Sequence, residues 1–297
     1  MARDVETDVT VLIKTFERPD CLRRLVASIR RFYPRIPILV VDDSAVPLDP
    51  VPDGITRYVP LAFNSVGLAE GRNVGLRHVK TPYVLISDDD MVFGRRTDLR
   101  KMLHVLETTR FDIVSCRWMD HDPWRSVCLG YKRTEGGAEI VDGAYVRRLD
   151  TPSGTMDGLP VFDLVHNFFM ASPARLGEDP WDARLKLLEH NEFFLRIKER
   201  GLLCTRLPDV VVDHYPRLPP DYYDLRRGTS RYLDLWYEER GIERRVVIGR
   251  WYTRRDRLVH YYPSLAAYGV RRTLGLARRA LPQRRATEAA AAENPSS

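Results

Sequence analysis

Three adjacent aspartates, Asp88, Asp89 and Asp90, are the residues whose type and spacing point most directly to chemistry. They follow an apolar run in the segment YVLISDDDMVF, residues 83–93. Adjacent carboxylates repel one another unless they are solvated, hydrogen-bonded or bound to a cation. Mg²⁺ and Mn²⁺ prefer oxygen ligands, and Mg²⁺ usually combines one or two carboxylates with water and substrate phosphate. The motif therefore favours a metal site for a diphosphate, with a solvated turn or a helix cap as the alternative.

Two more polar clusters follow apolar runs. Lys14 and Thr15 end the run TVLIKT, and Asp42 and Asp43 follow the run IPILVV. In sheets of parallel strands, ligands bind beyond the carboxyl ends of the strands. We therefore expect both clusters to lie near the three aspartates, with a ribose or a base at Asp42 and Asp43.

Strand and helix patterns alternate along the first part of the chain. Short apolar runs indicate strands, and apolar residues at helical spacing indicate helices between them. The strands are expected at residues 10–14, 36–41 and 83–87, and the helices at residues 17–34 and 67–79. This order predicts an α/β fold with a mostly parallel central sheet, helices on both faces and the site at the carboxyl ends of the strands.

The second half of the chain is less regular. Residues 130–160 are rich in glycine, proline and charge, which predicts hairpins or mobile loops and suggests a lid or an acceptor-side insert. Residues 182–201 predict an amphipathic helix closed by Gly201, and the run LPDVVVDH predicts a strand ending at His214. We expect a catalytic domain at 1–240, a basic helical extension at 241–285 and a disordered tail at 286–297.

The composition sets the protein class. The 297 residues are 44% hydrophobic, enough for a substantial core, and carry a net charge of +6. A positive charge suits nucleic acid, a membrane surface or an anionic substrate, and we expect no nucleic-acid partner. The polar first residues, the absence of a CxxC pair and the absence of a long apolar run predict a cytoplasmic protein.

Several common α/β chemistries lack their motifs. The first strand is not followed by GxGxxG, and neither GxxxxGK[ST] nor a GxSxG elbow occurs. Gly67, Gly71 and Gly75 recur every four residues within a predicted helix, which indicates close packing. These patterns argue against dinucleotide binding, P-loop chemistry and serine hydrolysis.

Seven segments, in this order, resemble the family-2-type glycosyltransferases of GT-A fold, most closely the β-1,4-N-acetylgalactosaminyltransferases of ganglioside synthesis. They are TVLIKTFERPDCLRRLVASIRRFYP, ILVVDDS, GLAEGRNVGL, YVLISDDDMVF, VHNFFMA, WDARLKLLEHNEFFLR and DVVVDH. The resemblance implies transfer of a sugar from a UDP-sugar to a hydroxyl of a glycan or glycolipid acceptor, with inversion. It suggests N-acetylgalactosamine, with N-acetylglucosamine, galactose and glucose as alternatives, and it implies Mn²⁺ or Mg²⁺.

The resemblance also implies roles for residues near the nucleotide. Thr15 and Asp43 match uridine-binding strand ends, and Arg72 and Asn73 match an element beside the nucleotide. With the strand-end clusters, the residues expected to bind the nucleotide sugar are Lys14, Thr15, Asp42, Asp43, Arg72, Asn73, Asp88 and Asp89.

The implied metal ligands are Asp90 and His214. Asp88 and Asp90 match the outer residues of the DxD motif, of which the first contacts ribose and the last holds the metal. His214 matches a histidine that completes the metal shell in many relatives. A lone histidine also commonly has a structural role, which is the alternative for His214.

The catalytic base is expected at Glu189 or His190. These residues match an acidic pair that faces the acceptor in relatives, where the second residue removes the proton. An imidazole with an ordinary pKa of about 6.5 suits a base at neutral pH, and a partly buried glutamate is the reverse assignment. Glu192 is a lesser candidate on the same helical face, and Asp163 is the next residue to test.

Other interpretations remain open at this point. A nucleotidyltransferase that forms sugar nucleotides would share a related sheet, and a non-catalytic nucleotide- or glycan-binding protein would share the fold. The basic segment at residues 265–285 predicts either peripheral contact with an anionic inner membrane surface or a solvated helix packed on its own domain.

Overall fold

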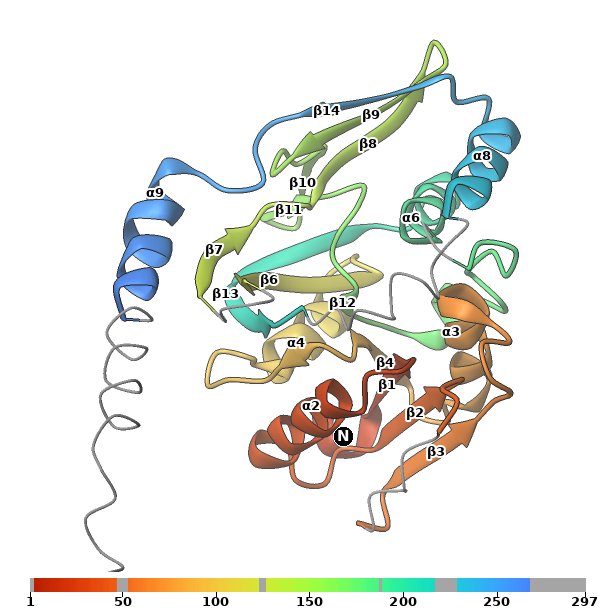
Figure 1. Ribbon diagram of the computed structural model, residues 1–297, viewed down its shortest axis with the longest axis vertical. Helices are drawn as coiled ribbons and strands as arrows, with labels where there is room; N and C mark the ends of the chain where they lie inside the picture. The colour runs from red at the N-terminus through yellow and green to blue at the C-terminus, as the bar shows by residue number, and fades with distance from the viewer. Residues whose placement is uncertain (1–2, 47–52, 123–126, 187–188, 217–228, 268–297) are drawn as a thin grey trace, which may run out of the picture.

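A nine-stranded sheet forms the centre of the molecule, with helices on both faces (Figure 1). The computed structural model describes residues 3–46, 53–122, 127–186, 189–216 and 229–267. Eight strands lie in the order β3-β2-β1-β4-β12-β6-β13-β5, and β7 pairs with β6. The strands are β1 (Val9–Thr15), β2 (Ile38–Asp42), β3 (Thr56–Pro60), β4 (Tyr83–Asp88), β5 (Met91–Val92), β6 (Ile113–His121), β7 (Cys128–Lys132), β12 (Phe168–Ala171) and β13 (Cys204–His214).

Most strands of this sheet run in one direction. Strands β1, β2, β3 and β4 are mutually parallel, and β6 and β13 are parallel to each other. Strand β12 is antiparallel to both β4 and β6, so these two groups share a direction. The carboxyl ends of β1, β2, β4, β6 and β13 therefore meet at one edge, as the sequence predicts.

The two faces of the sheet bury separate apolar cores, because successive strand residues point to opposite faces. Val11 and Ile13 of β1 join the core covered by α2 (Pro19–Phe32) and α4 (Leu99–Thr108), together with the short α1 (Val5–Asp8). Leu12 joins the opposite core, which contains apolar residues of α3 (Gly67–His78), α6 (Glu189–Glu199) and α8 (Thr229–Arg240). The result is a three-layer α/β arrangement.

Helix α3 packs closely on β1 because it carries glycines at the contact. A Cβ at Gly75 would lie 2.2 Å from Cδ1 of Leu12, and a Cβ at Gly71 would lie 2.4 Å from Cδ of Lys14. The packing interpretation of these glycines is confirmed. The same close approach confines the Lys14 side chain beneath the helix.

The glycine-rich region forms two hairpins. Strands β8 (Gly136–Val141) and β9 (Ala144–Leu149) pair antiparallel, as do β10 (Gly154–Met156) and β11 (Leu159–Val161). β14 (Arg244–Ile248) adds to β9 in parallel and completes a separate three-stranded sheet (Figure 1). The hairpin prediction is confirmed, and a function as a lid or acceptor-side insert stays a prediction.

Two predicted helical spans differ from the structure. Residues 182–186 form a turn, and α6 begins only at Glu189. Asp182 explains the turn, because its carboxylate accepts from Arg184 N at 3.0 Å and also pairs with Arg196. The expected helical extension begins instead with β14, and helical structure follows at α9 (Arg254–Asp256) and the π-helix η1 (Arg257–Tyr261). The expected disordered tail at 286–297 lies outside the described residues.

Candidate active site

The predicted polar clusters meet at the carboxyl edge of the sheet. Lys14 at the end of β1 lies opposite Asp88 of β4 in the strand register. His214 at the end of β13 lies opposite Asp120 of β6. Strands far apart in the sequence thus bring carboxylates, a lysine and a histidine to one region.

Lys14 forms a buried ion pair with Asp43. Its ammonium group contacts Oδ1 of Asp43 and donates to the Thr15 carbonyl at 2.6 Å. Burial lowers the pKa of Lys14, and the charge of Asp43 opposes that effect. Oδ2 of Asp43 accepts from the backbone N–H of Gly67 at 3.3 Å, at the N-terminus of α3. The pair therefore fixes the start of α3 relative to β1.

The carboxylate of Asp42 accepts hydrogen bonds from residues other than Lys14. Oδ1 accepts from the Ser44 N–H at 2.9 Å, and Oδ2 accepts from the hydroxyl of Tyr58. The side chain is buried. These contacts shape the end of β2, and a contact of Asp42 with a nucleotide stays a prediction.

The three consecutive aspartates point to three different partners. Asp88 accepts from Arg72 at 2.7 Å, and Asp89 is fully buried and accepts from the Thr15 hydroxyl at 2.7 Å. Asp90 faces His214. Burial raises the pKa of Asp89 to about 6. Asp88 thus points toward Arg72 of α3, and Asp90 points toward His214 of β13.

Arg18, in the loop after β1, relieves the repulsion between Asp89 and Asp90. Its guanidinium contacts Oδ1 of Asp89 and donates to Oδ2 of Asp90 at 2.8 Å. Burial alone would raise the pKa of Asp90, but Arg18 and His214 outweigh it and lower that pKa. Asp90 is therefore held as a carboxylate, the form that binds a metal ion.

His214 connects Asp90 to Asp120. Its Nδ1–H donates to Oδ1 of Asp120 at 2.5 Å, while Nε2 lies 3.5 Å from Oδ1 of Asp90. Burial would lower the pKa of His214, but Asp90 and Asp120 raise it to about 9. The contact with Asp120 leaves Nε2 as the nitrogen available to a ligand at Asp90.

These residues fit a divalent cation that is shared with a diphosphate. Asp90 Oδ1 and His214 Nε2 supply one oxygen and one nitrogen ligand that face each other across 3.5 Å. Among the described residues, no group of three or more His, Cys, Asp and Glu side chains forms a complete protein cage. A cation with two protein ligands takes its remaining ligands from water and substrate phosphate, as Mg²⁺ commonly does.

Arg72 lies beside the three aspartates and bridges two carboxylates. Its guanidinium donates to Asp88 of β4 and to Glu189, the first residue of α6. Both Arg72 and Glu189 are buried. A planar guanidinium holds two carboxylates at fixed positions, so Arg72 sets the distance between the end of β4 and the start of α6.

Asn73 holds the segment that leads to α6. Its side-chain amide donates to the Trp181 carbonyl at 2.9 Å and accepts from the Trp181 N–H at 3.2 Å. Both polar atoms of the Asn73 amide are therefore hydrogen-bonded to the backbone of Trp181. The predicted contact between Asn73 and a nucleotide is not visible in this arrangement and stays a prediction.

His190 and Glu189 lie together at the start of α6. His190 is partly exposed, and its Nδ1–H donates to Oδ1 of Asn167 at 2.6 Å, which leaves Nε2 as the acceptor. Burial and the charges of Arg147 and Arg72 hold the pKa of His190 well below its ordinary value of about 6.5. The imidazole is therefore neutral, but it is a weaker base than its ordinary pKa suggests.

Residues 10–130 match the family Glycosyl transferase family 2. This chain contains a glycosyltransferase family 2 domain. It is 38% identical over 235 residues to beta-1,4 N-acetylgalactosaminyltransferase 1 of Rattus norvegicus, covering 77% of this chain and 43% of that protein. It is 34% identical over 223 residues to beta-1,4 N-acetylgalactosaminyltransferase 2 of Mus musculus, covering 73% of this chain and 41% of that protein. The chain thus spans less than half the length of these relatives.

Solved structures agree on the fold of the glycosyltransferase family 2 domain. The crystal structure of S. aureus TarS 1-349 in complex with UDP-GlcNAc has a TM-score of 0.53 at 16% identity, covering 76% of this chain and 66% of that one. The complex of the same protein with UDP has a TM-score of 0.51 at 18% identity, covering 76% of this chain and 65% of that one. The predicted GT-A fold is confirmed.

The two lesser candidates for the base, Glu192 and Asp163, have structural partners. Glu192 is buried and accepts from Trp236 Nε1 at 2.8 Å and from Arg240, which ties α8 to α6. Asp163 accepts from Lys198 at 2.8 Å and from the Ala138 N–H at 3.0 Å. These contacts give Glu192 and Asp163 structural roles, so their presence requires no role at the active site.

The sequence interpretation missed Arg18, Asp120 and Trp118. Trp118 of β6 lies between the rings of His166 and His214, with ring centroids 4.0 and 4.6 Å away. One signal was available: the segment CRWMDH contains a polar cluster after apolar residues, like the other strand ends of this domain. Arg18 carries no such signal, because it belongs to an irregular loop.

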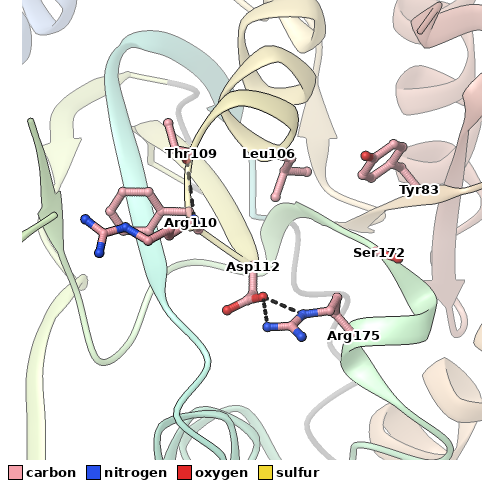
Figure 2. A pocket seen from close by; sticks show the side chains of 8 residues that line it. Tyr83, Leu106, Thr109, Arg110, Asp112, Ser172 and Arg175 are labelled. Carbon is pink, nitrogen blue, oxygen red and sulfur yellow. Dashed lines mark hydrogen bonds and ion pairs between the residues drawn. The ribbon is translucent and has the colours of Figure 1, made fainter. Parts of the chain in front are cut away.

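A cavity of about 520 Å³ lies at the opposite edge of the sheet (Figure 2). Its lining includes Tyr83, where β4 begins, and Asp112, which precedes β6. Figure 2 shows Asp112 and Arg175 pointing toward each other, and their ion pair measures 2.6 Å. Because Arg175 pairs with Asp112, and Arg110 pairs with Asp157 outside the lining, the cavity does not compete with the carboxyl edge as the candidate site.

Proposed function

We propose that this chain is an inverting, metal-dependent glycosyltransferase that moves a sugar from a UDP-sugar to a hydroxyl of a glycan or glycolipid. N-acetylgalactosamine is the favoured sugar because the relatives in mouse and rat are named for its transfer. The observation that carries the proposal is the separation of Asp88 and Asp90, which face Arg72 and His214 at the carboxyl edge. This arrangement leaves one carboxylate for the nucleotide and one for a cation.

The nucleotide would lie along the ends of β1, β2 and β4. The structural neighbour TarS is named as binding UDP and UDP-GlcNAc, which supports a uridine nucleotide here. Thr15 and Asp43 would contact uridine, and Asp88 would contact ribose. Lys14 supplies a positive charge beneath this region, although Asp43 already pairs with it.

Asp90 and His214 would hold Mn²⁺ or Mg²⁺ against the diphosphate. Such a cation neutralises the negative charge that develops on a departing diphosphate. Arg18 contributes a second positive charge, because its guanidinium already contacts both Asp89 and Asp90. These residues would thus stabilise the leaving group.

His190 would remove the proton from the acceptor hydroxyl. Nε2 of the imidazole has its lone pair available because Nδ1–H donates to Asn167. Arg72 holds Glu189 beside it, so Glu189 would orient the acceptor. The reverse assignment makes Glu189 the base and His190 the orienting group.

Release of UDP from a panel of UDP-sugars, with Mn²⁺ and glycan or glycolipid acceptors, tests this function. A glycosyltransferase releases UDP and forms a product with the inverted anomeric configuration. A nucleotidyltransferase would instead require a nucleoside triphosphate and a sugar phosphate. A non-catalytic binding protein would bind a UDP-sugar but release no UDP, and that result contradicts the proposal.

Contact with an anionic membrane would bring the enzyme to a lipid-linked acceptor. The structure has no membrane-crossing helix among its described residues. In η1 and the helical residues after it, Leu258, Val259 and Tyr262 are exposed, and Arg255 and Arg257 nearby in the chain are exposed as well. Apolar side chains with adjacent arginines suit the interface of an anionic bilayer. Most of the predicted basic segment at residues 265–285 lies outside the described residues.

A further inference from the structure

Residues 249–264, here called the seated segment, pack against β7. Arg133, just after β7, donates its N–H to the Trp251 carbonyl at 3.0 Å, and Ser264 Oγ accepts from the Cys128 N–H at 2.9 Å. The rings of Tyr131 and His260 meet edge to face at 5.4 Å. Contacts at Cys128, Tyr131 and Arg133 show that the segment has a defined place along β7.

The absence of a side chain at Gly130 leaves room for the seated segment on β7. A Cβ at Gly130 would lie 2.6 Å from Cβ of Asp256, which is buried and accepts from the Thr253 N–H at 2.7 Å. Gly130 also has φ +109, a conformation that side chains rarely adopt. A larger residue at this position would push Asp256 away from β7.

Tyr252 of the seated segment reaches the active site. Its hydroxyl donates to Oδ2 of Asp120, and Lys132 Nζ lies 3.4 Å from the same oxygen. The other oxygen of Asp120 accepts from His214 Nδ1. A continuous chain of contacts therefore runs from Tyr252 through Asp120 and His214 to Asp90.

The ring of His214 has little freedom to compensate for a change at Asp120. One face stacks on Trp118, whose other face is covered by His166. His166 is itself fixed by the fully buried Glu135, at 2.8 Å from its Nε2. The direction of His214 Nε2 therefore depends on Asp120, and the direction of the Asp120 carboxylate depends on Tyr252.

We propose that Tyr252 is a positioning residue for His214, and that the metal and diphosphate site is complete only when residues 249–264 are seated on β7. This inference rests on the proposed function. It assigns the seated segment a role at the nucleotide site. This role is separate from the membrane contact proposed for the exposed apolar side chains of the same segment.

Binding of Mn²⁺ to full-length protein saturated with UDP, measured by titration calorimetry, tests the inference without using activity. Tyr252→Phe removes one hydroxyl and should weaken Mn²⁺ binding by about 10-fold or more, the usual effect of losing a group that orients a metal ligand. Tyr262→Phe is the matched control, because it removes a hydroxyl from an exposed ring of the same region. Equal Mn²⁺ affinity in Tyr252→Phe and wild type overturns the inference.

Ser264→Ala removes the acceptor of the Cys128 N–H and tests the seating away from Asp120. Gly130→Ala tests the seating by a second route, at a residue that pairs with Asp120 in the β6–β7 register but leaves the side chains of Tyr252, Asp120 and His214 unchanged. It should weaken Mn²⁺ binding as much as Tyr252→Phe does, and the double variant should lose little more, because both act on one contact. Fully additive losses contradict the coupling between seating and Tyr252. Thermal unfolding of each variant checks that the fold is retained.

Failure of the proposed function gives a different result. Wild-type protein that binds UDP with no added affinity for Mn²⁺ overturns the metal-dependent function together with this inference. Strong Mn²⁺ binding by wild type with no loss in either variant overturns the inference alone.

Discussion

Arg72 and Glu189 form a buried ion pair across 117 positions of sequence. The pair joins α3 to α6, and the same guanidinium also holds Asp88 at the end of β4. A single side chain thus fixes the predicted nucleotide side of the site relative to the predicted acceptor side.

Arg72→Met should lower the free energy of unfolding by about 3 kcal/mol or more, because it leaves Glu189 buried without its counterion. Denaturant unfolding measures the change. Arg77→Met is the matched control on the same helix, because the ion pairs of Arg77 are largely exposed and should contribute at most about 1 kcal/mol. Equal losses in the two variants would contradict the buried character of the Arg72 pair.

Asp90→Asn should nearly abolish release of UDP from a UDP-sugar while the fold is retained. The amide cannot supply the charge that a divalent cation needs beside His214. Chelation of divalent ions should have the same effect on wild type. Asp209→Asn, at an exposed carboxylate paired with Lys101, is the control. Full turnover of Asp90→Asn, or of metal-stripped wild type, would show that the aspartates serve a structural turn.

His190→Ala and Glu189→Ala should each lower turnover by about 100-fold or more, the common scale of general-base catalysis, with little change in donor affinity. The pH profile of wild type checks the assignment to His190. Because burial lowers the pKa of His190, its neutral form persists well below pH 6.5, so the acidic loss of turnover should fall below that pH. Near-normal turnover of both variants across pH 5–9 would place the base elsewhere.

Gly71→Ala should weaken binding of UDP by about 10-fold, because the added Cβ displaces Lys14 from its contact with Asp43. Calorimetry with UDP measures the effect. Gly154→Ala is a suitable control, since a Cβ there meets nothing within 4 Å. Unchanged UDP affinity in Gly71→Ala would exclude Lys14 from the nucleotide site.

Replacing Leu258 and Val259 with serine should reduce sedimentation with anionic liposomes and leave hydrolysis of the soluble donor unchanged. The two side chains are 67% and 55% exposed, so the change should cost little stability. High salt should weaken liposome binding further, because exposed charges are screened within about 10 Å at 0.1 M ionic strength. A wild-type protein that ignores anionic liposomes at low salt would contradict membrane contact.

The sequence predicts the parts of the site that local patterns determine. Apolar runs followed by polar residues located Lys14, Asp43 and Asp88 at strand ends, and the structure brings them to one edge. Arg18 escaped prediction because an irregular loop carries no periodicity. The turn at residues 182–186 also escaped it, because the contacts of Asp182 override an amphipathic pattern that continues into α6.

Strand β14 shows the limit of local patterns most clearly. All five of its residues are exposed, so the alternation that marks a half-buried strand is absent. Its partner β9 lies about a hundred residues earlier in the chain, and pairings of such separation leave no local signal. The predicted helical character was therefore wrong for residues 244–248.

The seating of residues 249–264 on β7 also bears on the order in which the protein matures. The ribosome makes the amino-terminal part first, so β1, β4, β6 and β13 are all synthesised before Tyr252. A nascent chain therefore contains Asp90, Asp120 and His214 before the residue that orients His214 is made. Competence to bind a nucleotide with its cation would be one of the last properties the newly made chain acquires.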